Sequence, residues 1–209
     1  MKSDRELMAD FRHGDRPAFH KLIRRHHVAL LNFFHPLTGS QAAAEDLTQK
    51  TFLRIFAELE LQAESTLWGR SREDDAQPFT TFLTYLFRTG YICWLEQLRR
   101  EGLPRVLPQP ITANTSVPPV LIDVAEIPLP PAETPPEIFA LLAVLPNDLK
   151  PVVVLGEICR LSYAEIAAVL NVPTRAVRSR MKDAFAILRV PAKRENVPAA
   201  EVVPPEKSA

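Results

Sequence analysis

The stretch that decides the fold is residues 162–189, SYAEIAAVLNVPTRAVRSRMKDAFAILR. Ser162 and Glu165 have the spacing of a capping box, in which each side chain accepts a hydrogen bond from the backbone N–H of the other residue. Asn171 tolerates the left-handed conformation that a short turn needs, and Thr174 can open a second helix. Two helices joined by a short turn, the second of them basic, predict a helix-turn-helix.

The apolar and basic residues of this stretch fall on different helical faces. The inner face of the first helix is predicted to hold Ile166, Ala167, Val169 and Leu170, and that of the second helix Val177, Met181, Phe185 and Leu188. The second helix carries five basic residues, Arg175, Arg178, Arg180, Lys182 and Arg189, against one acidic residue, Asp183. A basic second helix is what contact with phosphates and base edges in a DNA major groove requires. An ordinary solvated helix face is the alternative interpretation.

Outward from this stretch, proline divides the chain. Ten of the 20 prolines fall between Pro104 and Pro136, and four more follow residue 190. Because proline lacks an N–H and disfavours helix in the residue before it, we expect an extended linker over 104–136 and a disordered tail over 191–209. Residues 106–136 of this linker contain three acidic residues and no Lys or Arg. It is either a passive spacer or an acidic strand suited to a basic channel.

The remaining chain forms two blocks, about 10–103 and 137–190, whose apolar residues recur at helical spacing. In the first block, Asp15 is expected to cap a helix with Pro17 in its opening turn. A turn is expected at 36–40, a second helix from Gln41, and a third over 79–100. Residues 60–78 read as a long loop. In the second block, proline is tolerated in the first turn of a helix but not in its interior. Because of Pro151, we therefore expect the first helix to begin near Lys150. The expected fold is therefore all-α, with two small helical domains joined by the Pro-rich linker.

Composition limits the function. With 46% apolar and 24% charged residues and no run of about 20 apolar residues, the chain is expected to be neither disordered overall nor inserted in a membrane. The N-terminus lacks the apolar core of a signal peptide, and Cys93 and Cys159 have no metal-binding spacing, so we expect a reducing cytoplasm. The histidines, all within the first 35 residues, have no completing ligands. With no nucleophile–base pair either, we expect no enzyme activity, metal or cofactor.

Taken in order, four stretches resemble the extracytoplasmic-function (ECF) sigma factors, the small two-domain members of the sigma-70 family. Residues 14–22, GDRPAFHKL, resemble the family's GDxxAFxxL opening, and residues 44–52, AEDLTQKTF, resemble AEDLxQETF. Residues 78–88, PFTTFLTYLFR, are similar to FxxWLYxIAR. Residues 161–180 resemble the family's LSYxEIA…VPxGTVKSRL, and the resemblance therefore covers both blocks.

The resemblance implies a division of labour between a sigma domain 2-like region (1–103) and a sigma domain 4-like region (137–190). The 41–58 helix would bind the β′ clamp helices of core RNA polymerase, with Asp46, Gln49, Lys50 and Phe52 as the binding residues. The loop and helix that follow would read the −10 element of promoter DNA through Trp68, Arg70, Arg72, Phe79, Arg88, Arg99 and Arg100. The second domain would meet the β flap and read the −35 element through Thr174, Arg175, Arg178, Ser179, Arg180 and Lys182. An anti-sigma factor is a further implied partner.

Several residues depart from the family pattern. Lys50 stands where the family usually has Glu, Thr89 and Cys93 replace an Asn and an Asp, and Asp183 interrupts a run that is basic in the family. These departures leave a second interpretation open, in which the chain is a sigma-like decoy that binds an anti-sigma factor without productive DNA binding. A plain helix-turn-helix repressor is a third, but it gives the 44–52 stretch no role.

Overall fold

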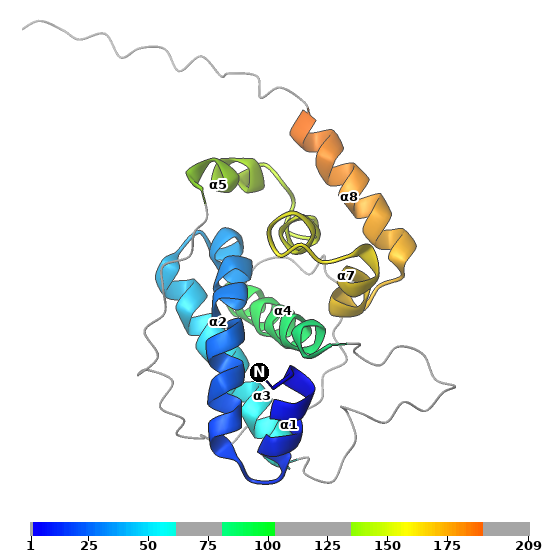
Figure 1. The fold of residues 1–209 in the computed structure, drawn as a ribbon. Helices are drawn as coiled ribbons and strands as arrows, with labels where there is room; N and C mark the ends of the chain where they lie inside the picture. The colour runs from blue at the N-terminus through cyan, green and yellow to red at the C-terminus, as the bar shows by residue number, and fades with distance from the viewer. Residues whose placement is uncertain (1, 62–80, 103–134, 190–209) are drawn as a thin grey trace, which may run out of the picture.

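The computed structural model describes residues 2–61, 81–102 and 135–189, and within these ranges all regular secondary structure is helical. The all-α prediction is therefore confirmed. The elements are α1 (Asp4–Arg12), α2 (Arg16–Thr38), α3 (Gln41–Leu61), α4 (Phe82–Arg100), α5 (Pro136–Ala143), α6 (Lys150–Val153), the π-helical turn η2 (Val154–Ile158), α7 (Tyr163–Leu170) and α8 (Thr174–Arg189) (Figure 1). Most of the predicted linker and the whole predicted tail lie outside the described residues.

The first block, α1 to α4, is a helical bundle with an aromatic centre. The rings of Phe11 and Phe56 lie 5.2 Å apart, and Phe19 packs against both at 5.1 and 5.3 Å. Burial of such rings is the main stabilising term for a bundle of this size. Helix α1 was not predicted from the sequence, although Ser3 and Glu6 form a capping box at its start.

Two predicted helix ends in the first block need correction. Asp15 does stand at the N-cap of α2, with Pro17 in the opening turn, but its side chain makes no capping hydrogen bond. Pro36 does not begin a turn, because α2 continues to Thr38 and the proline ring is buried in its last turn. The helix ends instead at Gly39, whose φ of 68° is the left-handed conformation that glycine adopts most readily.

The second block, α5 to α8, contains the predicted helix-turn-helix. The Glu165 N–H donates to Ser162 Oγ at 3.3 Å, and the Ser162 N–H donates to Glu165 Oε2 at 2.8 Å, which confirms the capping box. Asn171 is left-handed, with φ 54°, and α8 begins at Thr174 as predicted. A helix, α6, does begin at Lys150, but it is not the first of this block, because α5 (Pro136–Ala143) precedes it and was not predicted.

The inner face of this motif is partly as predicted. All four inner residues predicted for α7 are buried, and so are Val177 and Met181 of α8. Phe185 and Leu188 are only partly buried, whereas Ala184 lies in the core. The buried face of α8 therefore consists of Val177, Met181 and Ala184.

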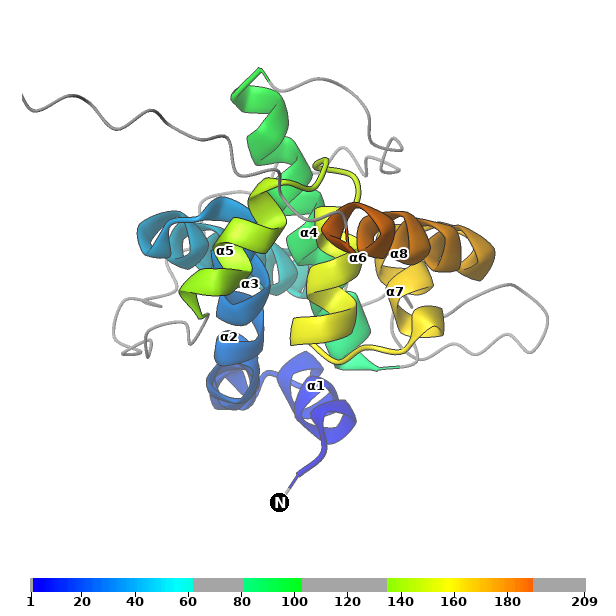
Figure 2. The same cartoon turned by 90° about the horizontal axis from the view of Figure 1, so that it is seen from above.

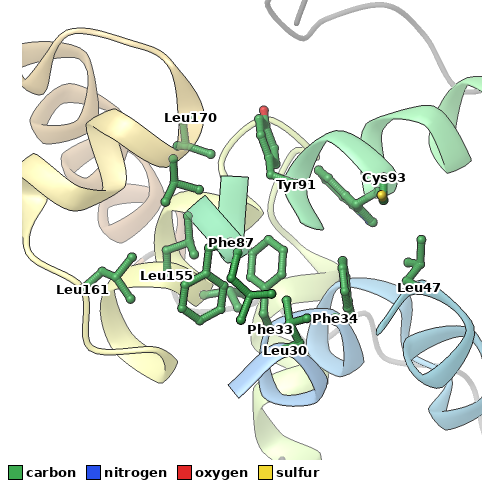
Figure 3. Close-up of a cluster of buried hydrophobic side chains, with 14 of the residues drawn as sticks. Leu30, Phe33, Phe34, Leu47, Phe87, Tyr91, Cys93, Leu155, Leu161 and Leu170 are labelled. Carbon is green, nitrogen blue, oxygen red and sulfur yellow. The ribbon is translucent and has the colours of Figure 1, made fainter. Parts of the chain in front are cut away.

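The two blocks pack against each other through α4, which lies between α2–α3 on one side and α7–α8 on the other (Figures 1 and 2). Phe87 of α4 lies near Leu155 and Leu161 of the second block, and Tyr91 of the same helix lies closer to Leu170 (Figure 3). Buried residues of both blocks therefore form one continuous hydrophobic core, which we call the closed arrangement. Within the described ranges, every helix is too short or too polar to cross a bilayer.

Candidate nucleic-acid interface

The outer face of α8 is open. Of the six residues predicted to read the −35 element, Thr174, Arg175, Arg178, Ser179 and Lys182 are exposed. Arg175, Arg178 and Lys182 are three, four and seven positions apart, so they share one helical face. None of these three forms an ion pair or a hydrogen bond within the described residues. This face, the α8 cationic face, has its charges available for phosphates or base edges.

Arg180 differs from the other α8 cations because it turns toward the first block. Its side chain is half-buried, and its charge acts on Tyr91 of α4. Burial raises the pKa of Tyr91 to about 12, and the positive charge of Arg180 partly offsets that rise. In the closed arrangement Arg180 therefore lies at the edge of the contact between the blocks, not within the α8 cationic face.

Asp183 adds a negative charge beside the α8 cationic face. It is exposed, and the Ser179 hydroxyl donates to its Oδ2 at 3.5 Å. No lysine or arginine forms an ion pair with it within the described residues. An acidic side chain here lowers the local positive potential that phosphates would meet.

Of the four α3 residues predicted to bind polymerase, three lie on the surface of the protein. Asp46, Gln49 and Lys50 are exposed, and Lys50 forms an ion pair with Asp46 one turn earlier. Phe52 is fully buried at 0% exposure, with its ring 6.5 Å from that of Phe19. The assignment of Phe52 to a binding surface is therefore wrong: it belongs to the bundle core and supports α3 from beneath.

A half-buried polar network fixes α3 to α4 behind this surface. The Arg54 guanidinium donates to Glu58 at 3.1 Å and to Glu96 of α4 at 2.9 Å. The Tyr85 hydroxyl donates to the other oxygen of Glu58 at 2.5 Å, and burial together with this carboxylate raises the pKa of Tyr85 well above its usual value. The sequence contains one signal of the network, the Arg54–Glu58 spacing, but none for the partners on α4.

Arg88, predicted to contact the −10 element, is engaged within the chain itself. It donates to the carbonyl oxygen of Ala168 at 3.1 Å and to the side-chain oxygen of Asn171 at 3.5 Å. Both acceptors lie at the C-terminus of α7, where carbonyls lack intrahelical partners and the helix dipole favours a cation. Burial lowers the pKa of the Arg88 guanidinium from its usual value. Arg88 therefore joins α4 to the first helix of the helix-turn-helix.

The other residues predicted for the −10 element divide into two groups. Arg99 and Arg100 are exposed in the last turn of α4, as a role at the DNA backbone requires. Trp68, Arg70, Arg72 and Phe79 lie outside the described residues. Thr89 and Cys93, which replace an Asn and an Asp of the family pattern, are 4% and 7% exposed and form part of the core.

A second contact joins the blocks at α2 and α5. The ring of His35 lies 4.9 Å from that of Phe139 at an interplanar angle of 78°, an edge-to-face arrangement. Together with Arg88, this contact holds the blocks together at two separate places. Within residues 2–61, 81–102 and 135–189, no three His, Cys, Asp or Glu side chains come close enough to hold a metal ion.

Comparison with known proteins matches the chain to a family model, to a relative and to solved structures. Residues 137–188 match the family model for sigma-70 region 4. Over 170 residues the chain is 32% identical to the ECF RNA polymerase sigma factor SigE of Mycolicibacterium smegmatis, an alignment that covers 79% of this chain and 58% of that protein. The chain thus spans less than two thirds of this relative.

Two solved structures share the fold. CnrH in complex with the cytosolic domain of CnrY gives a TM-score of 0.57 at 24% identity, covering 90% of this chain and 95% of that one. The sigma factor RpoE in complex with the anti-sigma factor NepR from Bartonella quintana gives 0.52 at 18% identity, covering 81% and 93%.

Proposed function

We propose that the chain is an ECF sigma factor of the sigma-70 family and that it directs core RNA polymerase to specific promoters for transcription initiation. The observation that carries this proposal is the α8 cationic face, where Arg175, Arg178 and Lys182 are exposed and unpaired within the described residues. We assign the −35 element of promoter DNA to this face, with Thr174 and Ser179 beside it. Arg180 becomes available to the same DNA element only when the two blocks separate.

Helix α3 supplies the surface for the polymerase β′ clamp helices. Asp46, Gln49 and Lys50 are its contact residues, and Phe52 acts only by holding the helix in place. The network around Arg54 supports this assignment because it fixes the orientation of α3 relative to α4. The β flap is assigned to the second block, and the regions 1–103, 104–136 and 137–190 to sigma domain 2, linker and sigma domain 4.

We assign the −10 element to α4 and to the residues that precede α4 in the chain. Arg99 and Arg100 are available in the closed arrangement, whereas Arg88 becomes available only when α7 moves away. We therefore propose that the two blocks separate when the chain assembles with polymerase. Trp68, Arg70, Arg72 and Phe79 keep their proposed role in capturing unpaired bases.

This function needs neither catalysis nor a cofactor by the chain itself and places it in the cytoplasm. An anti-sigma factor is the regulatory partner we expect, because the RpoE structure with a similar fold contains one. The closed arrangement supports such control, since a ligand that binds it more tightly than the separated form keeps the blocks together.

Run-off transcription with core RNA polymerase tests the proposal directly. Templates recovered from start-site mapping after overexpression of the chain are transcribed with core enzyme alone and with core enzyme plus the chain. We expect transcripts only in the second reaction. In a gel shift, the affinity of the chain for promoter DNA should fall between about 50 and 200 mM salt by the amount expected for several phosphate contacts. Absence of a chain-dependent transcript contradicts the proposal.

A second candidate function is the decoy, and one observation favours it. Arg88 is occupied by α7, so the closed form is poorly suited to bind promoter DNA through α4. A pull-down with core polymerase separates the two functions. A sigma factor is retained by polymerase, whereas a decoy is retained only by an anti-sigma factor.

A further inference from the structure

A basic cavity lies between the start of the chain and α2. Its volume is about 500 Å³, and it is lined by Lys2, Leu7, Lys21, Arg24 and Arg25. None of these residues belongs to the surfaces assigned above. The volume falls within the range of about 300–1,000 Å³ that is typical of sites for small ligands. The cavity is therefore large enough to hold one molecule of nucleotide size.

The charge of the cavity is only half neutralised. Lys2 Nζ bonds to Asp10 at 2.7 Å, and Arg25 forms an ion pair with Asp4 while it also donates to the Lys2 carbonyl at 2.8 Å. Two carboxylates thus offset two of the four cations and hold them in position. Lys21 and Arg24 are exposed and make no ion pair or hydrogen bond within the described residues. Two positive charges remain for an anion.

The lining also has an apolar part. Leu7 is 1% exposed and forms the floor, and lysine and arginine present aliphatic stems below their charged groups. Inorganic phosphate would use the charges and leave these carbon atoms uncovered. A ligand that carries a phosphate on a larger, less polar body satisfies both parts of the lining.

The cavity lies at the end of the bundle where α4 begins. Arg25 is followed directly by His26, whose ring lies 5.3 Å from that of Phe82, the first residue of α4. Because α4 is the helix assigned to the −10 element, a single strand that leaves α4 at its N-terminal end passes close to Arg25. Proximity to that helix favours a nucleotide over other phosphorylated ligands.

We propose that this cavity binds one nucleotide unit, with its phosphate on Lys21 and Arg24 and its sugar and base along Leu7 and the stems of Lys2 and Arg25. The unit comes either from single-stranded DNA that continues beyond the −10 element or from a free nucleotide. Only the first source rests on the proposed function.

Fluorescence anisotropy of the full chain tests this site with two probes. The first is a labelled single strand of about twelve thymidines, a length within the usual site sizes for such proteins, and the second is thymidine 3′,5′-bisphosphate as an unlabelled competitor. We compare Arg24→Glu and Lys21→Glu with Arg5→Glu, which makes the same change of charge at an exposed position of α1 outside the cavity. Circular dichroism melting verifies that each variant folds.

We expect Arg24→Glu and Lys21→Glu each to weaken binding of the strand about fivefold to tenfold, with a shallower salt dependence, because each reverses one phosphate-binding charge. Arg5→Glu should change it less than about twofold, because Arg5 does not line the cavity and is exposed to solvent, where its charge is weakly felt. Arg24→Lys should retain most of the binding. Competition by the bisphosphate at the same site indicates a free nucleotide as a ligand, and its failure to compete indicates the DNA strand.

Equal binding of both probes by the wild type and by the cavity variants overturns the proposal, even when the wild type supports transcription. In the reverse outcome, the cavity variants lose binding of the strand, but the wild type yields no polymerase-dependent transcript. In that case the proposed function fails while the nucleotide site stands.

Discussion

Helices α4 and α8 both carry arginines assigned to promoter DNA, but the arginine in the middle of α4 has different surroundings from those on the outer face of α8. Arg175 and Arg178 of α8 are exposed and unpaired within the described residues, whereas Arg88 of α4 is half-buried and donates to the Ala168 carbonyl. The residue type is the same and the surroundings differ. The comparison teaches that the residues proposed to read the −35 element are accessible in the closed arrangement, while Arg88, proposed for the −10 element, is accessible only after the blocks separate.

Separation of the blocks has an energetic cost on the α4 side. Phe87 and Tyr91 are 1% and 5% exposed and face the second block (Figure 3), so opening exposes apolar area to water. The Arg88 bond adds a charged hydrogen bond of about 1.5–3 kcal/mol. Under the proposed function, binding to polymerase supplies this free energy, because the apolar side chains of α4 lose their contacts when the blocks separate.

The largest effect should come from truncating an aromatic side chain on each helix. Phe87→Ala removes a ring that is 1% exposed and packs against Phe33 at 5.5 Å, so we expect a loss of about 3–5 kcal/mol in the free energy of unfolding. Phe185→Ala on α8 removes a half-buried ring and should cost about 1–2 kcal/mol. Urea unfolding of the full chain measures both losses in the free energy of unfolding. Equal losses would contradict the difference in burial between Phe87 and Phe185.

The next effect concerns the open face directly. Arg178→Glu should weaken binding to a duplex with the −35 element by about thirtyfold, roughly 2 kcal/mol, because one phosphate or base contact is replaced by repulsion. Retention by core polymerase should not change. Arg5→Glu, with the same change of charge on α1, serves as the control in a gel shift. A parallel loss of polymerase binding would show that α8 and α3 do not act separately.

A smaller effect is expected where Arg88 holds the closed arrangement. Arg88→Met keeps an apolar stem and removes the bonds to Ala168 and Asn171, so the open form should gain about tenfold in population, roughly 1.4 kcal/mol. Hydrogen exchange of the backbone N–H groups in α7 should then accelerate. Arg99→Met, an exposed position of the same helix, should leave that exchange unchanged. Identical exchange in the two variants is the result that would remove Arg88 from this role.

The smallest effect tests the acidic residue beside the α8 cationic face. Asp183→Asn should strengthen duplex binding about threefold, roughly 0.7 kcal/mol, because it removes a negative charge near phosphates. Glu157→Gln removes the same charge at an exposed position of η2 and serves as the control. Weaker binding by Asp183→Asn would instead indicate that the carboxylate accepts a hydrogen bond from a base.

Local signals in the sequence were sufficient for the helix-turn-helix. The Ser162–Glu165 capping box and the left-handed Asn171 depend on neighbouring residues only, and the structure has both as predicted. The errors arose where packing decides the outcome. Asp15 has the right residue type for a cap but makes no bond, and Pro36 is retained in α2 because its ring is buried and Gly39 ends the helix.

The candidate sites show the same limit. The resemblance identified the 44–52 stretch, but it did not distinguish exposed Gln49 from buried Phe52. The contact of Arg88 with Ala168 joins residues 80 positions apart, and no spacing rule within one helix can predict it. The basic cavity likewise depends on how α1 lies against α2, which a pattern of apolar residues does not specify.

The acceptor of the Arg88 bond is a main-chain oxygen, and this has an evolutionary consequence. Every amino acid at position 168 supplies the same carbonyl, so substitutions there leave that acceptor in place, whereas a substitution at position 88 removes the donor. Under the proposed role of Arg88 at the −10 element, a mutation of this residue would change both promoter preference and the contact between the blocks in a single step. Lineages that diverge in one of these traits through this codon must therefore diverge in the other as well.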